Sequence, residues 1–157
     1  MKKIFLAVAL ISIAFIQQTL AQDSTKTQSS PLLNSYYALK DALVSSNPST
    51  AAINAEAFVK ALNDIDTATV KEDSRKELLS DAGAIYQTKD LKVQRVKFAT
   101  LSANMFILAK SVKLSTEPVY QQYCPMKQAS WLSNSKVIKN PYYGSMMLTC
   151  GSVKATL

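Results

Sequence analysis

The sequence of 157 residues contains no histidine, and this absence excludes several kinds of chemistry. Without histidine there is no imidazole base to activate a serine or cysteine nucleophile, no imidazole zinc ligand and no histidine-based pH switch. A lone cysteine nucleophile would therefore lack its usual base. We expect no catalytic residues, and we interpret the protein as non-enzymatic.

Glycine is scarce as well, with only three residues in the whole chain. β-Sandwiches and β-barrels contain many turns, and glycine is one of the residues that turns favour most. The length of the chain fits a single domain. The sequence therefore predicts one helix-rich domain rather than an all-β fold.

Long hydrophobic runs are missing except near the N-terminus. Lys2 and Lys3 precede an apolar run from Ile4 to Ile16, and these 13 residues are fewer than the ~20 that a spanning helix needs. Thr19-Leu20-Ala21 then places small residues at the −3 and −1 positions of a cleavage site. This layout is typical of a secretory signal peptide. We predict that residues 1–21 are removed, leaving a periplasmic or secreted protein without a stable membrane anchor.

Acidic residues are nearly absent from the C-terminal part of the chain. Residues 22–90 contain 7 basic and 10 acidic side chains, whereas residues 91–157 contain 9 basic side chains and only Glu117. No arginine cluster with interleaved aromatic residues is present, and export would separate the protein from nucleic acid, so we expect no nucleic-acid partner. The basic half is interpreted as a solvated face that can attract an acidic partner.

Helical periodicity is the clearest feature that is present. The polar residues 22–31 are typical of a flexible tether, and residues 32–157 are expected to form a single helical domain. Apolar residues recur at spacings of three and four in four stretches. These contain Leu32, Tyr36, Leu39 and Leu43; Ala55, Phe58, Leu62 and Ile65; Leu78, Ala82 and Ile85; and Leu91, Phe98, Leu101, Met105, Leu108 and Val112.

The connections between these stretches are short, which favours antiparallel neighbours. Pro31 after Ser30 is placed to open the first helix, and Ser74 with Glu77 has the spacing of a capping box. The periodicity stops after Val112. We therefore predict an all-α fold, namely an up-and-down four-helix bundle followed by a short irregular C-terminal capping segment.

The rarest residue types gather in that C-terminal segment. Both cysteines, the only tryptophan, three of the five methionines and two of the three glycines lie between Cys124 and Gly151. The segment reads Tyr123-Cys-Pro-Met126, Trp131-Leu-Ser133, Ile138, Asn140-Pro-Tyr-Tyr-Gly144, Met147 and Cys150-Gly151.

This series resembles the signature of domain-of-unknown-function family 3347, a family of secreted bacterial domains mostly of the Bacteroidetes type. The likeness continues upstream through Asp90-Leu91, Arg95, Phe98, Leu101 and Ser102. The resemblance implies a relation to the C-terminal region of some adaptor subunits of copper/silver efflux pumps. The partner it implies is a periplasmic efflux adaptor or another envelope protein, and it implies no catalytic residues.

The two cysteines allow two interpretations. An exported chain with two cysteines commonly forms a disulfide, and a bond between Cys124 and Cys150 would close a loop of 27 residues. In the chain-entropy description such a loop stabilises the fold by ~3.5 kcal/mol. Trp131, Tyr142 and Tyr143 would then pack beneath the loop.

The other interpretation is a soft-metal site. Cu(I) and Ag(I) prefer thiolate and thioether ligands, and the chain offers Cys124 with Met126 and Met147 with Cys150 as two closely spaced pairs. Four sulfur atoms would then hold one ion. Because a disulfide removes both thiolates, the two interpretations exclude each other at any moment. Both require the cysteine sulfurs to converge.

Overall fold

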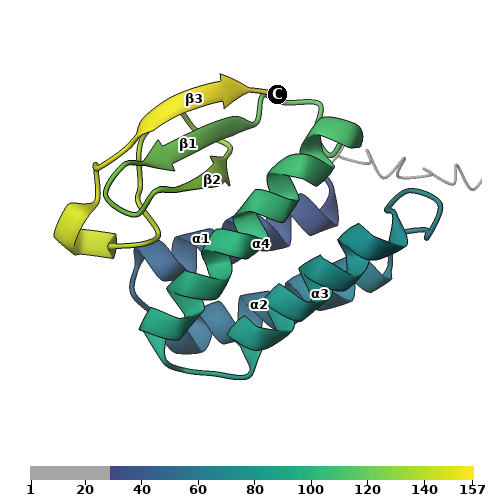
Figure 1. Ribbon diagram of the computed structural model, residues 1–157, viewed down its shortest axis with the longest axis horizontal. Coiled ribbons are helices and arrows are strands. Elements are labelled where there is room, and N and C mark those ends of the chain that lie inside the picture. The colour runs from purple at the N-terminus through teal and green to yellow at the C-terminus, as the bar shows by residue number, and fades with distance from the viewer. Residues whose placement is uncertain (1–28) are drawn as a thin grey trace, which may run out of the picture.

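The computed structural model describes residues 29–157 (Figure 1). The predicted signal peptide lies outside the described residues, as does the predicted tether up to residue 28. In chain order the elements are α1 (Pro31–Val44), α2 (Pro48–Asn63), α3 (Glu72–Tyr86), α4 (Leu91–Ser111), β1 (Tyr120–Cys124), β2 (Ala129–Ser133), the 3-10 helix η1 (Gly144–Met147) and β3 (Ser152–Thr156).

The four helices run antiparallel, and each contacts its neighbour in sequence (Figure 1). The predicted apolar faces are confirmed, because nearly all of their residues are buried in one core. Only Ile65, Leu91 and Val112, at the ends of their stretches, are partly exposed. The alternation of three and four residues was sufficient to find these faces, since a helix brings such positions to one side.

Capping side chains or acidic residues lie at the N-terminal ends of the helices. Ser30 Oγ accepts a hydrogen bond from the Leu33 N–H at 3.2 Å, and the predicted start of the first helix at Pro31 is confirmed. The capping box predicted at Ser74 and Glu77 is wrong, because α3 already begins at Glu72 and both residues lie inside it. Glu72 and Asp73 place negative charge in the first turn instead, where the helix dipole favours it.

The all-α prediction is wrong as well. The expected irregular capping segment forms a three-stranded antiparallel sheet with the strand order β2-β1-β3. Each strand has five residues, too few for alternation to stand out in the sequence. The segment is regular because its three strands pair with one another, although the local periodicity of the sequence did not indicate strands.

The sheet covers one side of the helices. β2 packs on α4, while α1 and α4 contact each other much less than α1 contacts α2. The Tyr36 and Phe98 rings stack at 5.3 Å between centroids, and Tyr142 lies 6.0 Å from Phe98 and 5.9 Å from Trp131. This aromatic row joins α1 and α4 to β2. The four antiparallel helices therefore share one core, and the sheet covers the side formed by α1 and α4.

One hydroxyl group ties the two layers together. Tyr36 Oη accepts a hydrogen bond from the Leu132 N–H at 3.0 Å and contacts Ser102 Oγ at 2.7 Å. A hydrogen-bonded group buried at the contact fixes how the sheet sits on the helices, since a shift would leave polar atoms unpaired.

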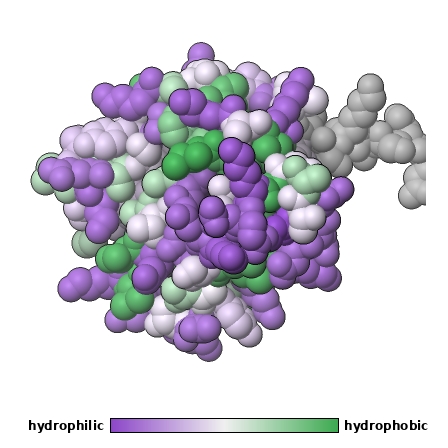
Figure 2. All heavy atoms as spheres, turned by 45° about the vertical axis from the view of Figure 1, so that its right-hand side comes forward, coloured by the Kyte–Doolittle hydropathy of each residue, from purple (hydrophilic) through white to green (hydrophobic). Residues whose placement is uncertain are grey.

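The surface is mainly hydrophilic on the face shown in Figure 2, where hydrophobic side chains form small separate groups. Within residues 29–157, no helix combines the length and hydrophobicity needed to cross a membrane.

Candidate functional site

The two cysteines meet at one end of the sheet. Cys124 is the last residue of β1, and Cys150 precedes β3, the strand that pairs with β1. Both are free thiols, and their Sγ atoms lie 3.7 Å apart. The predicted proximity is confirmed. Cys124 is fully buried whereas Cys150 is partly exposed, so solvent reaches the pair from the side of Cys150.

The contact changes the acidity of the thiols. The hydrogen bond with Cys124 raises the pKa of Cys150, and desolvation and the charge of Cys124 act in the same direction. The backbone N–H of Met126 lowers that pKa by binding the Cys150 sulfur, but it does not outweigh the other effects. Cys150 therefore stays protonated at neutral pH until oxidation or a metal displaces the proton.

The two methionines named with the cysteines approach the pair through their backbones. Met126 lies in the turn between β1 and β2 with 64% of its surface exposed. The Met147 carbonyl accepts a hydrogen bond from the Cys150 N–H at 3.0 Å. Ligation by their thioethers stays a prediction. No group of three or more His, Cys, Asp or Glu side chains suited to a metal occurs within the described range.

Asn140 holds the segment that carries Cys150. Its Nδ2 donates to the Cys150 carbonyl at 2.8 Å, and its Oδ1 accepts from the Tyr142 N–H at 2.8 Å. The Gly144 N–H donates to the Asn140 carbonyl at 3.0 Å, and Gly144 has φ of 57°. Residues 140–144 therefore form a turn, here called the Asn140 turn, and the Asn140 side chain links it to the segment that carries Cys150.

Arg95 anchors the same turn to the helices. Its Nε donates to the Pro141 carbonyl at 2.9 Å, and its Nη2 donates to the Leu43 carbonyl at 3.0 Å and to Ser46 Oγ at 2.9 Å. Burial lowers the pKa of Arg95. Sequence reasoning assigned no role to this residue. Its rarity was the available signal, since the chain has only two arginines and the other, Arg75, also donates to backbone carbonyls.

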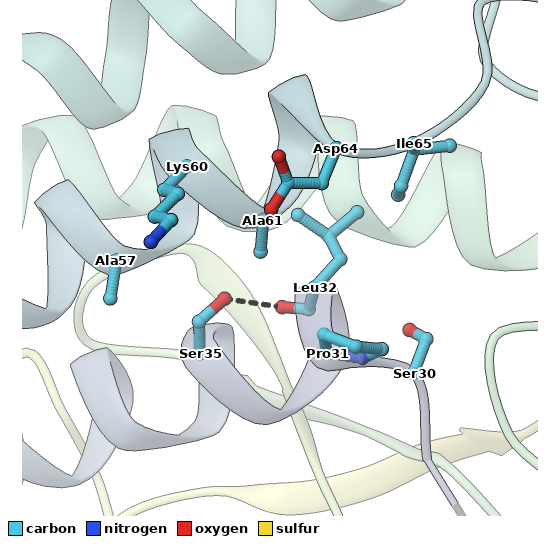
Figure 3. Close-up of a pocket in the computed structure, with 9 residues that line it drawn as sticks. All are labelled: Ser30, Pro31, Leu32, Ser35, Ala57, Lys60, Ala61, Asp64 and Ile65. Carbon is cyan, nitrogen blue, oxygen red and sulfur yellow. Dashed lines mark hydrogen bonds between the residues drawn. The ribbon is translucent and has the colours of Figure 1, made fainter.

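Two hollows of about 450 Å³ each open on the surface. The first, the helix-end groove, lies between the start of α1 and the end of α2 (Figure 3). The second, the basic hollow, lies between α4, the β1–β2 turn and η1. The basic hollow is lined by Leu91, Lys92, Arg95, Val96, Lys127, Tyr142, Tyr143 and Met146.

These features define an α+β protein with an antiparallel helical layer, a small covering sheet and a thiol pair at the edge of that sheet. Residues 32–117 match the family model described as "Protein of unknown function (DUF3347)", which is more than half of the chain, and the chain belongs to this family. The match covers the helices and ends before β1. No curated protein and no solved structure matches the chain.

Proposed function

We propose that this protein is an exported, non-enzymatic binding module whose thiol pair captures Cu(I) or Ag(I). The observation that carries the proposal is the 3.7 Å distance between Cys124 Sγ and Cys150 Sγ. Two thiolates that share a tetrahedral ion at about 2.3 Å lie ~3.8 Å apart, so the pair needs little rearrangement. Soft monovalent ions prefer sulfur ligands, and the chain has no histidine to compete for them.

Partial exposure of Cys150 gives an ion a route to the buried Cys124. Met126 is exposed and not packed in the core, so its thioether is free to turn toward the pair, while Met147 is next to Cys150 through its carbonyl. The proposed role is to hold or sense the ion in the periplasm in connection with efflux. A Bacteroidetes-type source, a relation to efflux adaptors and an adaptor or other envelope protein as partner belong to the same proposal.

The second candidate is a structural or protein-interaction domain in which Cys124 and Cys150 form a stabilising disulfide. The antiparallel pairing of β1 with β3 favours it, because the register Tyr123↔Ser152 brings Cys124, which follows Tyr123, close to Cys150, which precedes Ser152. Closing the sulfur atoms to a bond length of ~2.0 Å needs a movement of about 1.7 Å.

The distinguishing experiment is a competition titration of the fully reduced mature protein against a chromophoric Cu(I) chelator. We expect one ion per chain for the wild type and no competition by Cys124→Ser or Cys150→Ser. Met126→Leu and Met147→Leu should weaken binding at nearly unchanged melting temperature, since leucine keeps much of the methionine volume. Met146→Leu is the matched control, because Met146 is 76% exposed and is not among the proposed ligands.

A reduced wild type that fails to compete would end the metal proposal. Lower melting temperatures for both serine variants, with silent methionine variants, would then support the disulfide. Because metal binding must displace the thiol protons, the apparent Cu(I) affinity should rise with pH up to the raised pKa of Cys150. The same titration at several pH values measures this dependence.

A further inference from the structure

The basic hollow combines positive charge with apolar walls. Its cations are Lys92 and Arg95 on α4 and Lys127 in the β1–β2 turn, and no acidic side chain lines it. The walls come from apolar and aromatic side chains, among them Val96, Tyr143 and Met146. Figure 1 shows the start of α4, the β1–β2 turn and η1 on the same side of the molecule.

These cations have no carboxylate partners within the described part of the chain. The ion pairs found there are Lys40–Asp41 and Lys76–Glu72. Arg95 is partly buried, and its hydrogen-bond acceptors are two carbonyl oxygens and one hydroxyl, all uncharged. A partly desolvated guanidinium without a counter-charge is stabilised by any anion that reaches it.

The helix-end groove shows that an apolar hollow in this molecule need not be basic. It has the same volume, but Lys60 and Asp64 line it with one charge of each sign (Figure 3). The two opposite charges partly cancel, so this groove does not favour an anion over a cation. The basic hollow differs in carrying three cations and no anion.

We propose that the basic hollow binds a free small organic anion, with an acidic group held by Lys92, Arg95 and Lys127 and an apolar body against Tyr143 and Met146. Its volume of about 450 Å³ fits a small molecule, since such sites usually have about 300–1,000 Å³. This binding activity is independent of metal capture, because none of the lining residues is a proposed metal ligand.

The test uses 8-anilinonaphthalene-1-sulfonate, an aromatic anion whose fluorescence rises in apolar sites, and N-phenyl-1-naphthylamine, its uncharged counterpart. Both are titrated into the reduced, metal-free mature protein. The variant Lys92→Met/Lys127→Met removes two charges and keeps the apolar stems, and Arg95 is left intact because it anchors the Asn140 turn. Lys60→Met removes one charge from the other groove and is the control. Circular dichroism of each variant shows whether the fold is retained.

We expect saturable binding of the sulfonate dye that is weakened roughly tenfold in the double variant and unchanged in Lys60→Met. The uncharged dye should bind the wild type and the double variant equally. Equal sulfonate binding by a folded double variant, or no saturable binding by the wild type, would overturn the proposal. Neither result bears on the thiols, so the proposed metal capture is tested separately.

A second measurement identifies the source of the anion. Monomeric decanoate should displace the sulfonate dye from the wild type, which supports a free small molecule. Displacement only by vesicles containing phosphatidylglycerol, with no effect of decanoate, would contradict it and show that the hollow meets a membrane surface instead.

Discussion

Gly151 lies where a side chain has no room. A Cβ there would be 2.9 Å from Trp131 Cη2 and 2.9 Å from the Tyr123 carbonyl oxygen, and its φ of 151° is a conformation that other residues rarely adopt. Because the preceding residue in the chain is Cys150, this close approach to the sheet also holds the partly exposed thiol near Cys124.

We predict that Gly151→Ala lowers the free energy of unfolding by about 1–3 kcal/mol, because crowding and backbone strain both oppose the methyl group. Gly83 in α3 is the control, since a Cβ there meets nothing within 4 Å. Gly83→Ala should raise the stability by about 0.5–1 kcal/mol. Urea denaturation of both variants measures the two changes, and a neutral Gly151→Ala would show that the sheet yields easily.

At the scale of elements, one side chain joins three segments. Arg95 projects from α4 and binds the end of α1 through Leu43 and Ser46 and the Asn140 turn through Pro141. The planar guanidinium donates in several directions at once, which the single ammonium group of lysine cannot reproduce. The position of the segment before Cys150 therefore depends on a residue in the helical layer.

We predict that Arg95→Lys keeps the charge but destabilises the fold by about 1–3 kcal/mol, because carbonyl groups lose their donors. Lys97→Arg, on an exposed position of the same helix, should change stability by less than about 0.5 kcal/mol. Thermal melting of the two variants is the measurement. Equal melting temperatures would mean that solvent replaces the lost hydrogen bonds without cost.

At the scale of the whole molecule, buried tyrosines make stability depend on alkaline pH. Desolvation raises the pKa of Tyr36, Tyr37 and Tyr142 above the usual value of about 10. As pH rises above ~10, the unfolded chain loses these protons first, so the folded state becomes progressively less favoured. Below that pH the stabilisation is fully present.

We predict a decline of up to about 1.4 kcal/mol per pH unit for each such tyrosine above pH ~10. Urea denaturation between about pH 8 and pH 12 measures it, and phenolate absorbance should show these groups ionising together with unfolding. Tyr142→Phe should flatten the slope. A stability that stays constant above pH ~10 in the wild type would contradict the prediction.

The sequence by itself determined the helices and their buried faces, because periodicity and caps act over a few neighbouring positions. Leu32, Phe58 and Phe98 were placed in the core from spacing alone. The family was also predicted correctly from the sequence. The resemblance was strongest in the C-terminal segment, whereas the family model matches residues 32–117, which contain the helices.

Only the tertiary structure decided that the C-terminal segment is a sheet, that Arg95 reaches from α4 to the Asn140 turn, and that three cations line one hollow. The physical reason is distance along the chain. β1 and β3 are separated by 27 residues along the chain, and the sheet meets α4 where Trp131 packs against Tyr142 and Tyr142 packs against Phe98. The sequence pattern indicated that Cys124 and Cys150 lie close together. The pairing of β1 with β3 is what brings their sulfur atoms to a distance of 3.7 Å.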